Sequence, residues 1–191
     1  VVQYLAGPMD DDEKVTSFDT TGGQQHVTQS LATVGVYPGN SPNMGGAIGY
    51  DGDQVNGVDI ITPAYTFSEQ HTFRKSQVDD SYRRILAGLT GCVNNKKFRG
   101  FEAGEVLFKG ASGTMTTTDG QTEWQLMFHF AVSPNRFNFF VGDILIKEKM
   151  VWDYLWVRNG DEINANQLIK RPRSVYIERM YLFGNFADLR V

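Results

Sequence analysis

Histidine, cysteine and acidic side chains carry most metal and proton-transfer chemistry, so their spacing decides which sites a chain can build. The three histidines, His26, His71 and His129, fall in three different predicted strands. None of them has a second histidine, a cysteine or a pair of carboxylates at metal-ligand spacing, and the acidic run of residues 10–13 lacks the alternation and the glycine of a calcium-binding loop. We therefore predict no metal site and no cofactor, and we interpret the histidines as ordinary strand residues.

Two further residues, a serine and a cysteine, have nucleophilic side chains but lack the surrounding sequence motif of a catalytic nucleophile. Ser112 lies in Gly-Ala-Ser-Gly, whereas the serine elbow of hydrolases needs Gly-x-Ser-x-Gly between a strand and a helix. Cys92 is the single cysteine, which excludes an intrachain disulfide and indicates a reducing compartment. We interpret Cys92 as a small buried apolar residue and predict no catalytic residue, so the chain is expected not to be an enzyme. A pocket that holds a histidine beside a carboxylate would favour the enzymatic alternative.

Positive charge gathers in two short clusters. Their members are Lys96, Lys97 and Arg99 in the first, and Lys170, Arg171 and Arg173 in the second. Neither cluster interleaves aromatic residues as a platform for single-stranded nucleic acid does, and the formal net charge of −4 argues against a surface that coats nucleic acid. We interpret both clusters as solvated turns or as charge partners for a neighbouring subunit.

Aromatic surface is the feature that no catalytic interpretation explains. Residues 151–158 alternate, with Trp152, Tyr154 and Trp156 on one face and apolar residues on the other, which predicts a strand covered on both faces. Cover for the aromatic face comes either from a second sheet or from another copy of the chain. We predict an assembly interface whose candidate residues are Trp152, Tyr154, Trp156, Lys170, Arg171 and Arg173.

Period-two alternation predicts a mainly β fold, a sandwich or barrel of antiparallel strands. The clearest predicted strands are residues 122–133, 151–158 and 174–183, and the weaker ones are residues 55–62, 64–73, 101–108 and 137–146. Residues 14–34 predict a hairpin that reverses at residues 20–23, because Thr-Thr-Gly-Gly tolerates positive φ. Residues 37–57 and 110–122 are rich in glycine and predict two long loops.

One segment has helical instead of strand periodicity. Apolar residues recur at i, i+3, i+4 and i+7, and they are Tyr82, Ile85, Leu86 and Leu89. This spacing predicts one flanking α-helix over residues 79–89, with an aspartate at its start and Gly91 at its end. No linker divides the sequence and no apolar run approaches the roughly 20 residues that span a bilayer. We expect a single domain over residues 1–191 and no membrane segment.

The C-terminal two thirds of the sequence resembles tailed-bacteriophage virion proteins. The segments that carry the resemblance are Val58-Asp59-Ile60, Phe67-Ser68-Glu69, Leu89 to Asn94, Gly104 to Gly113, Trp152 to Arg158 and Lys170 to Tyr181. The order of the expected elements is also similar to that of phage tail-tube proteins, whose subunits are β-sandwiches or barrels with a flanking helix that assemble into stacked rings. The resemblance implies a structural protein of the virion, assembled in the host cytoplasm, and it brings no catalytic residues.

We therefore expect a tail-tube or tube-like ring protein whose partners are other copies of itself and neighbouring virion proteins. Strand edges and Gly-rich loops would pair with adjacent subunits, and an acidic lumen would let DNA pass without specific binding. One alternative is a capsid decoration or cement protein, which would be monomeric or trimeric on a shell. Another is a β-sandwich module that binds a glycan or a receptor, which would expose coplanar aromatic rings in a groove.

Overall fold

The computed structural model describes residues 15–30, 33, 44–51, 54–164 and 167–191. It is mainly β, with one α-helix among these residues, which confirms the predicted fold class. Backbone contacts gather in two compact units: unit 1 comprises the described residues of Val1–Asp19, Tyr65–Val132 and Phe183–Val191, and unit 2 those of Thr20–Ala64 and Ser133–Leu182. The single domain expected over residues 1–191 stays a prediction, and each unit is described by itself.

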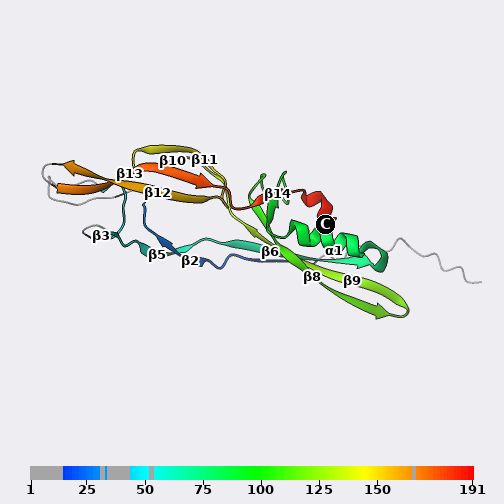
Figure 1. The fold of residues 1–191 in the computed structure, drawn as a ribbon. Coiled ribbons are helices and arrows are strands. Elements are labelled where there is room, and N and C mark those ends of the chain that lie inside the picture. Colours follow the sequence, from blue (N-terminus) through cyan, green and yellow to red (C-terminus); the bar gives the residue numbers. More distant parts are fainter. Residues whose placement is uncertain (1–14, 31–32, 34–43, 52–53, 165–166) are drawn as a thin grey trace, which may run out of the picture. The chain divides into compact units, whose positions relative to one another are not determined.

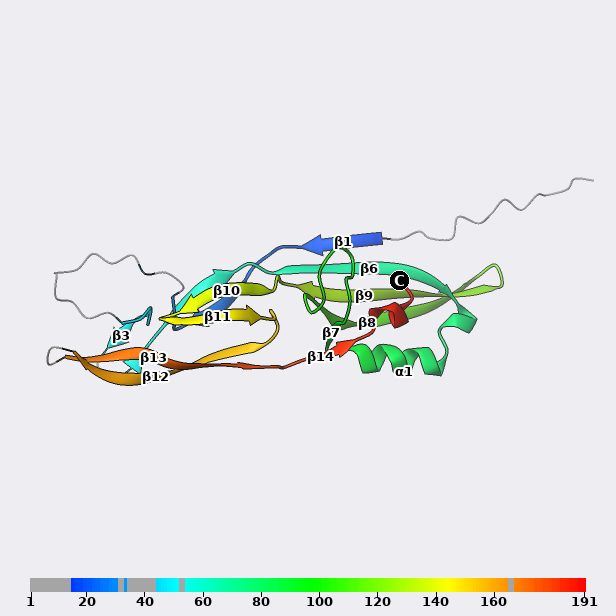
Figure 2. The same ribbon diagram turned by 90° about the horizontal axis from the view of Figure 1, so that it is seen from above.

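Unit 1 is built on a six-stranded sheet (Figures 1 and 2). Its strands, in spatial order, are β1 (Val15–Asp19), β6 (Tyr65–Arg74), β9 (Gln121–Val132), β8 (Val106–Thr118), β7 (Cys92–Asn94) and β14 (Leu182–Gly184). The central strand β9 pairs antiparallel with both β6 and β8. Its residues Leu126, Phe128 and Phe130 are all buried, which confirms the face predicted from their alternation.

The α-helix α1 (Asp80–Leu89) forms where the apolar spacing predicts it. Its N-terminus is capped by the side chain of Asp79, which accepts a hydrogen bond of 2.7 Å from the backbone N–H of Tyr82. The stripe of Tyr82, Leu86 and Leu89 is buried. The chain leaves the helix through Gly91, whose φ of +81° favours glycine.

Two 3-10 helices complete unit 1, η1 (Lys75–Gln77) before α1 and η2 (Phe186–Leu189) near the C-terminus. The core is aromatic: Phe67 stacks on Phe130 with a centroid distance of 4.7 Å, and Phe186 of η2 packs edge-on against Phe98 at 5.2 Å. The Tyr82 hydroxyl donates a 2.5 Å hydrogen bond to the carbonyl of Leu189, so α1 holds the C-terminal 3-10 helix in place.

The loop predicted over residues 110–122 is wrong. This stretch belongs to the β8–β9 hairpin, which reverses at Asp119 (φ +51°) and Gly120 (φ +79°). Two consecutive residues with positive φ form the two-residue turn that matches the twist of antiparallel strands. The Asp-Gly pair marks this turn, and the threonines before it favour a strand. The strand predicted over residues 101–108 begins only at Val106.

Unit 2 consists of four separate two-stranded sheets. The pairs are β2 (Gly23–Val27) with β5 (Val58–Thr62), β3 (Tyr50–Asp51) with β4 (Gln54–Val55), β10 (Arg136–Val141) with β11 (Ile144–Lys149), and β12 (Tyr154–Asn164) with β13 (Gln167–Glu178). Pro172 of β13 covers the turn between β10 and β11, because a Cβ on Gly142 would lie 2.8 Å from the proline ring. The loop predicted over residues 37–57 falls partly outside the described residues, and its described part contains β3 and β4.

The hairpin predicted over residues 14–34 is also wrong. β1 pairs with β6 and β2 pairs with β5, with Val15 opposite Gln70 and Val27 opposite Val58. A Cβ on Gly22 would lie 2.6 Å from the carbonyl oxygen of Thr62, so this glycine permits the close approach of two backbones and does not reverse the chain.

Three further strand boundaries differ from the predictions. Residues 137–146 are not one strand but the β10–β11 hairpin, because the chain reverses at Gly142 (φ +58°). The strand predicted over residues 151–158 begins at Tyr154. The one predicted over residues 174–183 ends at Glu178, and β14 follows it. Glycine and local turns override the alternation in each apolar run.

Candidate assembly interface

The β12–β13 hairpin brings most of the predicted interface residues together. Antiparallel pairing places Trp156 opposite Tyr176, and their rings stack at a centroid distance of 4.2 Å with an interplanar angle of 15°. Tyr154, two residues before Trp156, lies on the same face. Tyr154 is 60% exposed, Trp156 40% and Tyr176 39%, so this face carries aromatic surface in contact with solvent. Among the described residues, the expectation that both faces of this strand are covered is wrong, because the aromatic face is exposed.

Trp152 is placed differently from the other two predicted aromatic residues. It lies in the turn that precedes β12 and is partly buried. Its ring packs edge-on against Tyr181 with a centroid distance of 6.3 Å and an interplanar angle of 85°. The alternation that places Trp152, Tyr154 and Trp156 on one strand therefore holds only for the last two.

The three basic candidates lie on β13 and pair with acidic residues of β12. Lys170 forms an ion pair with Asp161, and the guanidinium groups of Arg171 and Arg173 lie 3.3 and 3.4 Å from one carboxylate oxygen of Glu162. The interpretation of this cluster as a solvated turn is wrong, because all three residues lie within the strand β13 and their acidic partners lie on the neighbouring strand β12. The positive charges are offset within the hairpin, which lowers the cost of removing this surface from water.

Glycine allows the charged side chains to cross the hairpin. A Cβ on Gly160 would lie 2.5 Å from Cγ of Arg173. The side chain of Arg173 therefore occupies the space above Gly160 on its way to Glu162. A larger residue at position 160 would displace it.

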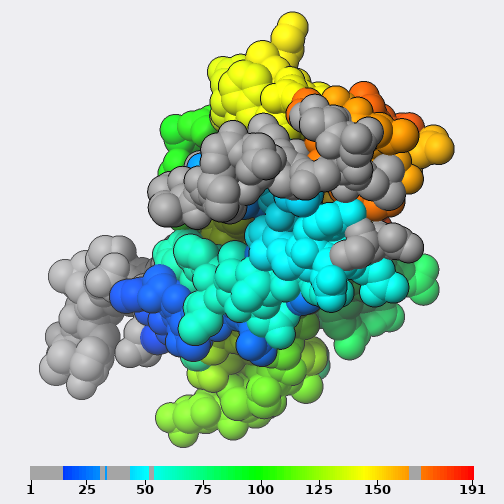
Figure 3. Space-filling view, turned by 90° about the vertical axis from the view of Figure 1, so that its left-hand side faces the viewer, coloured from blue at the N-terminus to red at the C-terminus, as the bar shows by residue number. Residues whose placement is uncertain are grey.

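Burial is distributed unequally between the two units. Among the described residues, fifteen of the eighteen buried apolar side chains belong to unit 1, and unit 2 contributes only Val141, Ile146 and Ile169. Of the eighteen large apolar residues that are exposed, fourteen belong to unit 2. They are Val58, Ile60, Ile61, Phe137, Phe140, Leu145, Tyr154, Trp156, Ile163, Tyr176, Ile177, Met180, Tyr181 and Leu182. Figure 3 shows the β5 segment of this set, in turquoise, at the molecular surface.

Two histidines lie beside carboxylates, which is the arrangement that would favour an enzyme. The ring of His26 contacts Oδ1 of Asp59 at 2.8 Å and the carbonyl of Asn56 at 2.8 Å, and both side chains are exposed on the β2–β5 ribbon. The hydrogen bond to Asp59, followed by the one to Asn56, raises the pKa of His26 above its ordinary value. This exposed pair is shared between neighbouring strands and has no third catalytic group in contact among the described residues.

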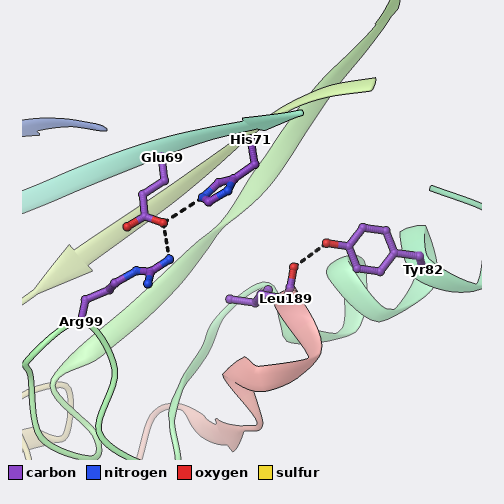
Figure 4. Close-up of polar contacts among 5 residues, drawn as sticks. All are labelled: Glu69, His71, Tyr82, Arg99 and Leu189. Carbon is purple, nitrogen blue, oxygen red and sulfur yellow. Dashed lines mark hydrogen bonds and ion pairs between the residues drawn. The ribbon is translucent and has the colours of Figure 1, made fainter. Parts of the chain in front are cut away.

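The second histidine belongs to a buried ion cluster that sequence reasoning missed. One carboxylate oxygen of Glu69 accepts hydrogen bonds from Nη2 of Arg99 at 2.7 Å and from Nε2 of His71 at 3.0 Å (Figure 4). Glu69 is only 2% exposed and lies on the core face of β6, between Phe67 and Phe73. A carboxylate within an alternating apolar face is the signal that could have identified it.

This cluster is suited to structural support. Arg99 has a φ of +50° and sits in a turn closed by reciprocal backbone hydrogen bonds between Phe98 and Phe101. Its guanidinium contacts Glu69 and offsets the charge of the carboxylate, so the turn is anchored to β6. No group of three or more histidine, cysteine or acidic side chains in the described part of the chain is arranged to hold a metal ion.

Asn94 is a second buried polar residue that pattern reasoning did not identify. Its side chain donates to the carbonyls of Lys96 at 2.7 Å and Glu102 at 2.9 Å, and accepts from the backbone N–H of Val106 at 2.8 Å. The amide therefore satisfies backbone groups across the whole 94–106 loop. Cys92, two residues earlier, is a partly buried free thiol.

Within the described residues, no helix is both long enough and apolar enough to cross a membrane. Comparison of the chain with protein-family models, with curated proteins and with solved structures finds no match.

Proposed function

We propose that this protein is a structural subunit that performs no reaction and assembles with further copies of itself through the hairpins of unit 2. The observation that carries the proposal is the unequal burial: two units of similar length hold fifteen and three buried apolar side chains among the described residues. A unit that leaves fourteen large apolar residues exposed and buries only three gains stability when another surface covers them.

The architecture of unit 2 is a second reason to expect that another surface covers it. An isolated two-stranded ribbon is marginal in water, and unit 2 is made of four such pairs. In the described part of the chain no third strand pairs with the outer edges of these ribbons, and such edges can pair with another chain. Covering the remaining surface of Tyr154, Trp156 and Tyr176 would contribute about 3–5 kcal/mol, at the usual value of a buried aromatic side chain.

A second copy of the chain fits this surface better than a strongly charged partner. The β12–β13 hairpin pairs its cations with its own carboxylates, so two copies can approach without a large repulsion. Three cations face two carboxylates, so the excess on these residues is a single positive charge, which is too small to select a strongly acidic ligand.

The finer version of the proposal is a tail-tube or tube-like ring protein of a phage virion, assembled in the host cytoplasm with neighbouring virion proteins. Its support is the sequence resemblance described above, together with a net charge of −4, which suits a lumen through which DNA passes. A capsid decoration protein would use the same apolar surface on a shell and differs in the geometry of its assembly.

A glycan-binding module has less support. Sugar rings stack on the free faces of aromatic side chains, whereas Trp156 and Tyr176 already stack on each other. Trp152 stands edge-on to Tyr181 instead of extending an aromatic platform.

Sedimentation velocity of the full chain over a range of concentrations tests the proposal. The wild type should form large species, and Tyr154→Ser combined with Trp156→Ser should shift the distribution to smaller ones. Phe18→Ser is a matched control, because Phe18 is an exposed aromatic residue of unit 1. Circular dichroism establishes that each variant is folded. A wild type that stays monomeric at the highest concentration, or a double variant that assembles as well as the wild type, would contradict the proposal.

A further inference from the structure

The outer edge of β8 is open over its last seven residues, Ser112–Thr118. On that side β8 pairs with β7 only at Leu107, opposite Val93, and the last backbone bond is from the N–H of Gly91 to the carbonyl of Phe108 at 2.8 Å. Beyond Phe108 no described residue pairs with the outer edge of β8, and all seven residues of Ser112–Thr118 are exposed. Within unit 1, Figures 1 and 2 show the end of the β8–β9 hairpin extending past α1 and β7.

The turn determines which backbone groups face the open edge. Because Asp119 and Gly120 form a two-residue turn, Thr118 and Gln121 make the first hydrogen-bonded pair of the hairpin, and the pairs alternate from there. The hydroxyls of Thr117 and Thr122 lie 2.9 Å apart, as expected for a pair without mutual backbone bonds, whose side chains are closer. The outward-facing residues of the edge are therefore Ala111, Gly113, Met115 and Thr117.

The residue types along this edge differ from those that usually prevent an open strand edge from pairing with another chain. Proteins usually guard open edges with lysine, proline or a bulge. The segment Ser112–Thr118 has no charged residue and no proline, and the one irregularity of the strand lies earlier, between Phe108 and Gly110. Four of its seven residues are threonine, which favours strands, and threonine and serine form hydrogen-bonded cross-strand pairs.

We propose that the open edge of β8 pairs antiparallel with the same edge of a second copy, about a two-fold axis at Thr114. The four outward-facing residues are symmetric about Thr114, so one register satisfies all of them in both copies. Ala111 then bonds to Thr117 of the other copy, and Gly113 to Met115. Ser112 faces Thr116, and Thr114 faces its own counterpart. A two-fold contact of this kind is isologous, and it joins two sheets without placing like charges together.

This contact deepens the proposed function, on which it rests, because it assigns a second, distinct surface to self-assembly. The exposed aromatic face of unit 2 and the edge of β8 lie on different strands, so a chain that uses both can form more than a closed pair.

Charge substitutions at the two-fold axis provide a specific test. Thr114→Lys or Thr114→Glu alone places two like charges opposite each other, and each should weaken dimerisation about tenfold or more. An equimolar mixture of the two variants places lysine opposite glutamate and should restore association. Gln125→Lys is the matched control, because Gln125 is exposed and lies opposite Thr114 on β9, one strand away from the edge. Its effect should be much smaller.

The dimer is measured by sedimentation equilibrium in the background of Tyr154→Ser and Trp156→Ser, so that association through unit 2 does not obscure it. Loss in each single-charge variant with recovery in the mixture supports the pairing. Unchanged dimerisation in Thr114→Lys, or loss without recovery in the mixture, overturns it. If Thr114→Lys leaves assembly intact in the wild-type background while the unit 2 variants abolish it, the edge pairing is wrong and the proposed function still stands. If the wild type never associates, both are wrong.

Discussion

Removing the guanidinium of Arg99 should destabilise unit 1 because the buried carboxylate of Glu69 loses the cation that contacts it at 2.7 Å. Glu69 is 2% exposed, and breaking a fully buried ion pair costs about 3–5 kcal/mol. The Arg99 side chain is itself 32% exposed, so solvent screens part of the interaction. We therefore expect Arg99→Ala to lower the free energy of unfolding by about 2–3 kcal/mol.

Urea denaturation followed by circular dichroism measures this loss, and a double-mutant cycle isolates its cause. In a Glu69→Gln background no buried charge remains to be offset, so Arg99→Ala should then cost less than about 1 kcal/mol. Arg99→Lys is the control that keeps the charge while it loses the guanidinium geometry, and its effect should be intermediate. If Arg99→Ala costs the same in both backgrounds, the ion pair does not anchor the turn and the reasoning is refuted.

Three more predictions concern unit 1. Burial raises the pKa of Tyr82 to about 12, so with rising pH the unfolded chain loses the phenolic proton before the folded chain does. The free energy of unfolding should therefore fall between about pH 10 and 12, and Tyr82→Phe should remove this pH dependence in unfolding titrations. Asn94→Ala should cost about 2–4 kcal/mol in urea denaturation, because three backbone groups lose their partner; a loss under 0.5 kcal/mol would contradict this role. Gly113→Ala places a Cβ 2.2 Å from Cδ2 of Leu126, so it should destabilise the hairpin by about 1–3 kcal/mol. Combining it with Leu126→Ala should cost less than the two separate losses added together, and simple additivity would argue against the clash.

The sequence predicts best where one periodicity runs without interruption. The stripe of Tyr82, Leu86 and Leu89 identifies α1, and the alternation of residues 122–133 identifies β9 and its buried face. In both cases every inward position is apolar, so local preference and tertiary packing agree.

Prediction fails where a glycine has two physical uses. Gly22 permits close approach to Thr62, whereas Gly120 and Gly142 reverse the chain, and composition alone does not distinguish these roles. The resulting errors are the false hairpin over residues 14–34, the missed hairpin within 137–146 and the false loop over 110–122. Strand pairing between segments far apart in sequence, such as β1 with β6, is set by the fold and not by neighbouring residues.

The contacts of the candidate interface also depend on strand pairing that the sequence alone does not reveal. Alternation places Tyr154 and Trp156 together, but it does not reveal that Trp156 stacks on Tyr176 of the neighbouring strand. The sequence does not reveal the partners of the basic residues of β13, because these partners, Asp161 and Glu162, lie across the hairpin. Cross-strand register decides both contacts.

Electron microscopy of the purified full chain tests the central claim most directly, because it shows both the assembly and what covers unit 2. The account predicts rings or filaments in which the β12–β13 hairpins lie between subunits and Trp156 is buried. Isolated particles of one chain at every concentration, with Trp156 still in contact with solvent, would contradict it.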